Sequence, residues 1–340
     1  MKPTDFSYAL SKYLSVYLPG QYNASPHTIL AYRDTFKLLL RYAEDKRKTT
    51  PERLTLAMID KTFVYDFLSW LESNGNGIST RNQRLAAVRA FFRYLQWERP
   101  DMLACCQEIL SIPLKRAEKA TIDYLSVEAV KALLAAPDAS DKYGLRDRTM
   151  LCLLYDSGAR VSELASLSPS NLRLDSSPIV TMLRKRRKKC QCPLSPAVVE
   201  HLRHYLSVWK LDSPEKSAEP LFTNHEGERI GRAGVAYILQ KYSDMVRCDN
   251  PALIPQSVSP HMIRHSRAMH LLQAGVNLIY IRDWLGHESV KTTEIYARAD
   301  SEMKRSAIQK AAAAAMPMQS SQNLWADDSE LLEWLNSLGK

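Results

Sequence analysis

Residues 109–125 interrupt the helical pattern of the chain and separate two stretches of different character. Their sequence, LSIPLKRAEKATIDYLS, lacks sustained apolar periodicity, contains Pro113 and carries mixed charge, which is typical of an interdomain linker. With 340 residues, the chain is also too long for one ordinary hydrophobic core. We therefore expect two domains, one at residues 1–108 and one that begins at residue 126.

The stretch before this linker is predicted to be all helical. Apolar residues recur at helical spacing in residues 26–47, which follow a Ser-Pro start signal, and again in residues 57–73. After the breaker NGNGIS, a third helix is expected at residues 79–96. It carries four arginines, Arg81, Arg84, Arg89 and Arg93, with no acid among them. These arginines favour contacts with a DNA backbone, and a solvated helix face is the alternative.

The stretch after the linker combines helices with one region of strand pattern. Helices are expected at residues 126–136, 145–157, 196–209, 231–247, 260–274, 277–285 and 288–297. A β-hairpin is expected in LRLDSSPIVTMLRKRRKKCQCPLSP, where short apolar pieces flank turn residues. The predicted fold class is therefore mainly α with a small β component (α+β).

The charge balance indicates a polyanionic partner. Lysine and arginine number 46 against 37 acidic residues, which leaves a net charge of +9 and a pI near 9.2. Such a surplus favours nucleic acid, although a basic enzyme without that partner has the same balance. No apolar run approaches the roughly 18 residues of a membrane span, and the N-terminus lacks the apolar run of a signal peptide. We therefore expect a cytoplasmic protein with reduced cysteines and no membrane partner.

Cys190 and Cys192, followed by His201 and His204, raise the question of a zinc site. Their C-x-C spacing is not the C-x-x-C spacing of a zinc knuckle, and a run of basic residues precedes them. We therefore expect no metal ion.

Four short segments contain side chains suited to one reaction: Arg160 and Glu163 in DSGARVSEL, Lys185 in LRKRRKKCQCPL, His261 and Arg264 in SPHMIRHS, and His287 and Tyr296 in WLGHESVKTTEIYAR. Two arginines and imidazole donors can clamp a phosphodiester whose negative charge grows in the transition state. A tyrosine hydroxyl can attack the phosphorus, and a lysine can protonate the departing 5′ oxygen. Because side chains supply the positive charge, this set needs neither a metal nor a cofactor. Each residue alone is more typical of a surface or core position.

The order of these segments resembles the tyrosine recombinase (phage-integrase) family. The segment HMIRHSRAMHLLQAGVNLIYIRDWLGHESVKTTEIYA is similar to the family signature, with His287 23 positions after Arg264 and Tyr296 nine positions after His287. The motif GARVSEL matches the first catalytic arginine and its acidic partner to Arg160 and Glu163. Counting back from Pro193 in the hairpin matches the family lysine to Lys185.

This resemblance implies a helical core-binding domain and a mixed catalytic domain at residues 126–300, which close on double-stranded DNA as a C-shaped clamp. It implies that Tyr296 attacks the backbone phosphate and forms a 3′-phosphotyrosyl link, without ATP. The phosphate would be stabilised by Arg160, Arg264, His261 and His287. Lys185 would be the general acid, and Glu163 would fix Arg160 or His261.

One departure from the family concerns the hairpin. The family lysine usually lies between glycines, whereas here it lies within Arg184-Lys185-Arg186-Arg187-Lys188-Lys189. A turn without glycine adopts positive φ less readily, so its tip is expected to differ. Lys188 is therefore the rival for the general acid. The remaining basic residues, Arg184, Arg186, Arg187 and Lys188 where it is not the acid, are expected to contact phosphates or to form a solvated patch.

Several biological roles fit this chemistry. We favour a mobile-element integrase or transposase, since the 301–340 tail is long for a chromosome-dimer resolvase; a Xer-like dimer resolvase is the alternative. A type IB topoisomerase shares the chemistry, but the domain order and the spacing to Tyr296 favour recombination. From a different class, a non-catalytic DNA-binding regulator would bind DNA without cleaving it. The target DNA, the directionality and the accessory proteins are left open.

The tail contains a last amphipathic helix at residues 327–338. Its apolar face is formed by Leu331, Trp334, Leu335 and Leu338. Because twelve residues hold no stable helix alone in water, this face must bury against another surface. The resemblance implies docking in trans on a neighbouring protomer of a tetramer on DNA, and docking on its own catalytic domain is the alternative.

Overall fold

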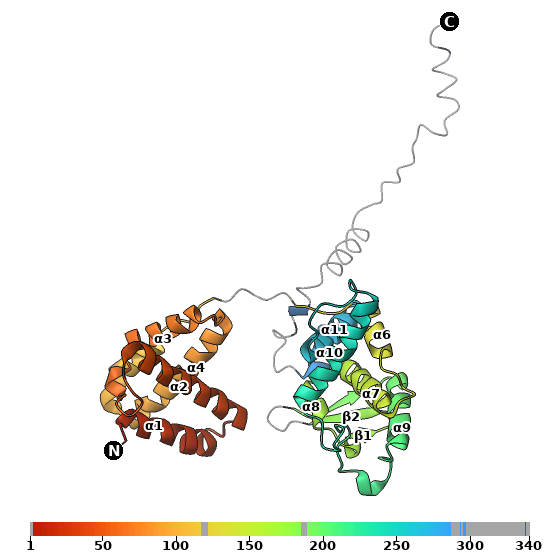
Figure 1. Ribbon diagram of the computed structural model, residues 1–340, viewed down its shortest axis with the longest axis horizontal. Coiled ribbons are helices and arrows are strands. Elements are labelled where there is room, and N and C mark those ends of the chain that lie inside the picture. The colour runs from red at the N-terminus through yellow and green to blue at the C-terminus, as the bar shows by residue number, and fades with distance from the viewer. Residues whose placement is uncertain are drawn as a thin grey trace. The chain divides into compact units, whose positions relative to one another are not determined.

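The computed structural model describes residues 3–116, 122–184 and 189–286, together with Thr293, Ile295, Tyr296 and Ser337. The chain divides into two compact units, Met1–Ala120 and Thr121–Lys340 (Figure 1). Each unit has a hydrophobic core of its own. Within the described residues, no helix is long and apolar enough to cross a membrane.

Unit 1 is helical throughout its regular elements. They are α1 (Asp5–Lys12), a π-helical segment (Tyr13–Gln21), α2 (Pro26–Arg47), α3 (Lys61–Ser73), α4 (Ile78–Glu98) and α5 (Leu103–Leu110), with 3-10 turns at Leu56–Met58 and Pro100–Met102. Helix α2 has the bounds predicted from the sequence. Ser25 caps it by accepting a hydrogen bond from the Thr28 N–H, and Pro26 occupies a first-turn position that needs no N–H.

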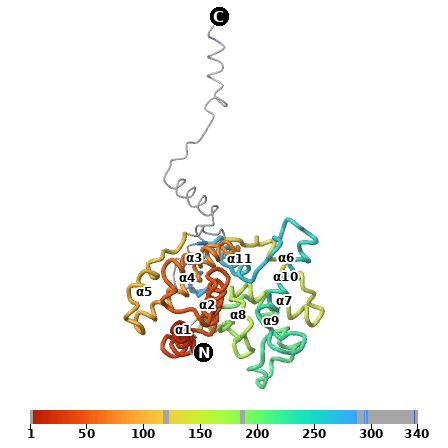
Figure 2. Tube along the Cα trace, turned by 60° about the vertical axis from the view of Figure 1, so that its left-hand side comes forward, coloured from red at the N-terminus to blue at the C-terminus, as the bar shows by residue number. Residues whose placement is uncertain are grey.

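The core of unit 1 forms around α4, which packs against α2, α3 and α5 (Figures 1 and 2). The buried Phe91 ring of α4 lies 5.1 Å from the Phe36 ring and 5.3 Å from the Tyr13 ring, between ring centroids, in edge-on contacts. Phe6 makes a third edge-on contact at 6.0 Å. Aromatic rings prefer this geometry because the positive edge of one ring meets the negative face of another.

The linker predicted at residues 109–125 is too long at both ends. Ile109 and Ile112 are fully buried in the core of unit 1, while Leu125 is buried in unit 2. Asn82 of α4 also donates a hydrogen bond to the Lys115 carbonyl at 2.8 Å. Two apolar residues three positions apart are too short a pattern to reveal the end of a packed helix, which explains the error.

Unit 2 combines helices with a small sheet. The helices are α6 (Val127–Ala135), α7 (Lys142–Ser157), α8 (Val161–Ala165), α9 (Pro196–Val208), α10 (Arg232–Asp249), α11 (Pro260–Gln273) and α12 (Leu278–Leu285), with 3-10 turns at Pro169–Asn171 and Pro214–Lys216; the strands are β1 (Leu172–Arg173), β2 (Ile179–Leu183) and β3 (Lys189–Pro193). The strands form an antiparallel sheet in the order β1-β2-β3, and the buried Val180 pairs with the buried Cys192. The predicted α+β class and the predicted hairpin are confirmed.

Helix α7 is the centre of unit 2. Twelve of its sixteen residues are buried, and it packs against α6, α9 and α11 (Figure 1). It ends at Gly158, whose φ of +57° suits glycine. The chain then turns directly into α8, so the core helix determines where the GARVSEL motif lies. The helix expected at 327–338 lies outside the described residues, apart from the helical Ser337.

Candidate active site

Glu163 holds Arg160 at the start of α8. Arg160 is the N-cap residue of this helix, and Glu163 occupies its third position. One carboxylate oxygen of Glu163 accepts the backbone N–H of Arg160 at 2.9 Å, and the other accepts the Arg160 Nη1 at 2.7 Å. Glu163 is buried, whereas the Arg160 side chain is 28% exposed. The ion pair therefore fixes the orientation of a guanidinium that solvent, or a ligand, can still reach.

Arg264 is buried on α11 and connects two helix ends. Its Nη1 donates to the Gly158 carbonyl after α7, and its Nη2 donates to the Leu285 carbonyl at the end of α12. Burial, reinforced by the nearby positive charge of Arg160, lowers the pKa of Arg264 to about 10. The side chain is nevertheless charged at neutral pH. It is a cation held in the interior by backbone carbonyls.

Tyr296 is fully buried and packs with Met269, Leu272, Ile281 and Leu285. Burial raises the pKa of its phenol to about 12, and the positive charges of Arg264 and Arg160 oppose that rise. The two arginines therefore act electrostatically on the tyrosine oxygen. Glu163 binds Arg160, while Arg264 binds the carbonyl of Leu285, which packs with Tyr296. We call Arg160, Glu163, Arg264 and Tyr296 the Tyr296 cluster.

His265 also contacts the Tyr296 cluster, although the sequence analysis did not single it out. Its Nδ1 lies 2.8 Å from the Tyr296 hydroxyl oxygen, at hydrogen-bond distance. Burial, followed by the charges of His261 and Arg264, lowers the pKa of His265 from its ordinary 6.5. The spacing of His261 and His265 could have pointed to His265 as a site residue, because residues four apart share one helix face.

The other predicted catalytic residues are placed as follows. His261 is exposed in the first turn of α11, which Ser259 caps by accepting the Met262 N–H. Lys185 and His287 lie outside the described residues, as do Arg186, Arg187 and Lys188.

Two family models match the chain, one in each unit. Residues 123–303 match the phage integrase family, and residues 11–99 match the phage integrase N-terminal SAM-like domain. The chain is 38% identical over 323 residues to the putative integrase/recombinase y4rC of Sinorhizobium fredii, covering 94% of this chain and 95% of that protein. It is 31% identical over 300 residues to the tyrosine recombinase XerC of Pelotomaculum thermopropionicum, covering 87% and 95%. The chain belongs to the phage integrase family.

Solved structures of integrases and recombinases share the fold of this chain. The Tn1549 transposon integrase in complex with transposon right end DNA gives a TM-score of 0.67 at 16% identity, covering 89% of this chain and 99% of that one. The XerH recombinase in a post-cleavage complex with a difH substrate gives 0.66 at 22% identity, covering 84% and 80%. The family match confirms the predicted class of enzyme, a tyrosine-type site-specific DNA recombinase.

Arg184 does not have the exposed position that was predicted for a DNA contact of this integrase-family chain. It is only 8% exposed, and its Nη1 and Nη2 donate to the carbonyls of Asp283 and Trp284 in the last turn of α12. The end of β2 directs the side chain inwards, because unpaired carbonyls at a helix C-terminus attract a cation. The solvated position expected for Arg184 is therefore wrong, and its contact with DNA stays a prediction.

The arginines of α4 in unit 1 do not all lie on a solvated helix face. Arg81 is 3% exposed, with its Nε 3.3 Å from Glu72 of α3 and its Nη1 3.4 Å from the Pro113 carbonyl. The carboxylate that pairs with Arg81 is that of Glu72 on α3. Because α4 itself contains no acidic residue before Glu98, its own sequence suggested that the charge of Arg81 was unpaired. Arg84 is half-buried and donates to the Ala31 carbonyl at 3.2 Å, and its contact with DNA stays a prediction. Arg89 is half-buried and Arg93 is exposed, and their contact with DNA stays a prediction.

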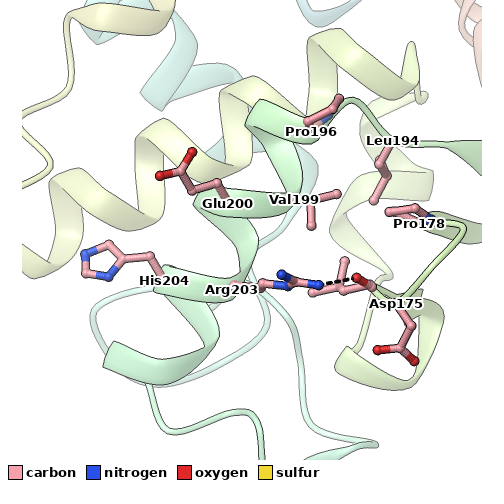
Figure 3. A pocket seen from close by; sticks show the side chains of 9 residues that line it. Asp175, Pro178, Leu194, Pro196, Val199, Glu200, Arg203 and His204 are labelled. Carbon is pink, nitrogen blue, oxygen red and sulfur yellow. Dashed lines mark hydrogen bonds between the residues drawn. The ribbon is translucent and has the colours of Figure 1, made fainter.

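An open pocket of about 520 Å³ lies between the β1–β2 connection and α9 (Figure 3). Arg203 crosses it and donates to the Leu174 carbonyl at 2.6 Å. None of its lining residues belongs to the Tyr296 cluster. His204 lines this pocket, whereas the buried Cys192 thiol contacts the Ser157 carbonyl. Among the described residues, no three potential metal ligands lie together.

Proposed function

We propose that this recombinase cleaves DNA by attack of Tyr296 on a backbone phosphate. The attack forms a 3′-phosphotyrosyl link and releases a 5′ hydroxyl, and the 5′ hydroxyl of a partner strand then attacks that link. The phosphodiester bond energy is kept in the phosphotyrosine, so ATP is not needed. The observation that carries the proposal is the burial of Tyr296 beside Leu285, whose carbonyl accepts from Arg264, in a place where the charges of Arg264 and Arg160 favour the phenolate.

The roles of the neighbouring side chains follow from their charge and exposure. Arg160 retains exposed surface while Glu163 holds it, so it would bind a non-bridging phosphate oxygen. Arg264 would supply positive charge from the interior, and the exposed His261 would donate a hydrogen bond to the phosphate. The resemblance adds His287 as a further donor and Lys185, or its rival Lys188, as the acid for the departing oxygen.

Cleavage by Tyr296 can be tested with a nicked suicide duplex that contains the DNA flanking the coding sequence. The wild-type protein should form a covalent adduct on it, and Tyr296→Phe should form none while binding the duplex equally well, because the ring persists without its nucleophilic oxygen. Tyr280→Phe is the matched control, since Tyr280 is 70% exposed on α12. Adduct formation by Tyr296→Phe would refute the assignment. Binding without any adduct from the wild type would favour a non-catalytic regulator.

Within this class, we propose integration or transposition of a mobile element as the role. The 38% identity to a putative integrase/recombinase and the fold shared with a transposon integrase support it. The Xer-like alternative is supported by the 31% identity to a XerC recombinase. Recombination between two copies of the element's end, with none between chromosomal dimer-resolution sites, would support the mobile-element role; the reverse result would support the resolvase. The protein would work in the bacterial cytoplasm, on nucleoid DNA.

We further propose that recombination uses a tetramer joined by C-terminal tails. The supporting feature is the apolar face at residues 327–338, formed by Leu331, Trp334, Leu335 and Leu338, which would dock in trans. Deletion of residues 324–340 should preserve binding to one site but impair synapsis, as light scattering of the protein–DNA complex would show. Normal tetrameric synapses and recombination by the truncated chain would contradict docking in trans.

A further inference from the structure

We propose that His265 is a catalytic residue that accepts the proton of the Tyr296 hydroxyl during cleavage and returns it during rejoining. The inference rests on the proposed function of Tyr296 as the nucleophile. It starts from the 2.8 Å contact between the His265 Nδ1 and the phenolic oxygen.

The reaction needs such an acceptor. Burial raises the pKa of the Tyr296 phenol to about 12, so at neutral pH roughly one molecule in 10⁴ to 10⁵ carries a phenolate. The neutral phenol is a poor nucleophile, and an adjacent base is the usual way in which proteins activate such a hydroxyl. Arg160 and Arg264 lower the cost of a negative oxygen, but a charged guanidinium has no acceptor site.

His265 has the properties of this base. It lies one helical turn after His261 on α11, so both imidazoles occupy the same face of the helix. Burial, with the charges of His261 and Arg264, lowers the pKa of His265, which keeps the ring neutral and able to accept a proton at neutral pH. In the tautomer that carries its hydrogen on Nε2, the Nδ1 lone pair accepts the Tyr296 O–H.

The cleavage step makes one bond to phosphorus, breaks another and moves two protons. The bond from the Tyr296 oxygen to phosphorus forms, the bond from phosphorus to the 5′ oxygen breaks, and the phenolic proton passes to Nδ1 of His265. The departing 5′ oxygen takes a separate proton from the general acid, assigned to Lys185. On rejoining, the 5′ hydroxyl gives its proton back to that base, and the His265 imidazolium protonates the leaving phenolate.

His270 provides a matched control on the same helix. It is also a half-buried histidine whose Nδ1 lies 2.8 Å from a tyrosine hydroxyl, that of Tyr155, while its Nε2 donates to the Leu125 carbonyl at 2.9 Å. Tyr155 has no place in the proposed chemistry. A variant at His270 therefore removes an equivalent histidine–tyrosine contact without touching the reacting oxygen.

The test measures single-turnover adduct formation on the suicide duplex. His265→Asn keeps an oxygen near the position of Nδ1 but cannot take up a proton, so adduct formation should slow by about 10²-fold or more. Binding of the duplex should be unchanged, and His270→Gln should react at close to the wild-type rate. Placing 2,3,5-trifluorotyrosine, a more acidic phenol, at position 296 should restore much of the lost rate in His265→Asn and add little to the wild type. His265→Gln serves as a second variant if His265→Asn unfolds.

Three results would overturn the proposal. A wild-type rate in His265→Asn would show that no proton acceptor is needed at this position. A faster rate would show that the contact restrains the buried Tyr296 before DNA binds. Slow adduct formation in His265→Asn that the more acidic phenol does not rescue would show that His265 supports the structure and does not accept the proton. Failure of the proposed function is distinguishable, because Tyr296→Phe would then still form the adduct or the wild type would form none.

Discussion

Replacing Gly286 by alanine should destabilise unit 2 much more than an ordinary glycine-to-alanine change. Gly286 follows the last residue of α12 with a φ of +62°, and the guanidinium of Arg184 lies directly over its α-carbon. A methyl group there would overlap the Nη1 of Arg184. The substitution therefore imposes a left-handed backbone on alanine and also expels a buried cation.

The two costs can be estimated separately. The left-handed conformation costs roughly 1–2 kcal/mol for a residue with a Cβ. Expulsion of Arg184 removes its hydrogen bonds to the Asp283 and Trp284 carbonyls, each worth about 1.5 kcal/mol for a charged donor. We therefore expect a loss of roughly 4–5 kcal/mol from Gly286→Ala. Gly275 is the control, because its φ of +84° is also positive but nothing lies near its added Cβ; Gly275→Ala should cost only the conformational term, about 1–2 kcal/mol.

A double-mutant cycle with Arg184→Ala tests the reasoning by urea denaturation of the full chain. Arg184→Ala alone should lose the same two hydrogen bonds, and adding Gly286→Ala to it should then cost only about 1–2 kcal/mol. The coupling of roughly 3 kcal/mol is the expected signature of the overlap. Strictly additive costs, or equal losses from Gly286→Ala and Gly275→Ala, would refute the account of Arg184.

Further predictions concern unit 1, acid stability and the general acid. Arg81→Ala should cost about 2 kcal/mol in urea denaturation, because the pair with Glu72 is largely buried. Arg93→Ala should leave stability unchanged but reduce the slope of log K for DNA against log salt by about 1. Burial lowers the pKa of His270 from 6.5 in the folded state, so stability should fall as the pH drops below that value, and His270→Gln should weaken this dependence in denaturation measured at several pH values. Lys185→Ala should slow cleavage, and a DNA substrate with a 5′-bridging phosphorothiolate should restore the cleavage rate, because a thiolate leaves without a proton. If this substrate rescues Lys188→Ala and not Lys185→Ala, Lys188 is the general acid.

Features encoded by local signals were predictable from the sequence. The Ser-Pro start and helical periodicity predicted the bounds of α2, and the turn residues between apolar pieces predicted the β1–β2 hairpin. The spacing of the motifs predicted a site, and among its members the structure shows Glu163 bound to Arg160 and Arg264 bound to the carbonyl of Leu285, which packs with Tyr296. These features depend on neighbours a few residues away, or on a family pattern.

Features that depend on partners from other elements were not predictable. Arg81 is balanced by Glu72 of α3, and Arg184 is bound by carbonyls of α12 about a hundred residues later. In sequence, both look like exposed members of basic segments. His265 was missed for the same reason, because only the return of the chain to Tyr296 distinguishes it from any other half-buried histidine on a helix.

Arg184 and Arg264 both bind the end of α12. The Asp283 and Trp284 carbonyls accept from Arg184, and the Leu285 carbonyl accepts from Arg264, so two cations satisfy the last turn. Positive charge at a helix C-terminus is also favoured by the helix dipole. Arg184 immediately precedes Lys185, and Gly286 immediately precedes His287, so the pair ties the strand before the proposed acid to the turn before a proposed phosphate ligand. The basic run of this chain therefore begins with a side chain that fixes the end of β2 to the last turn of α12.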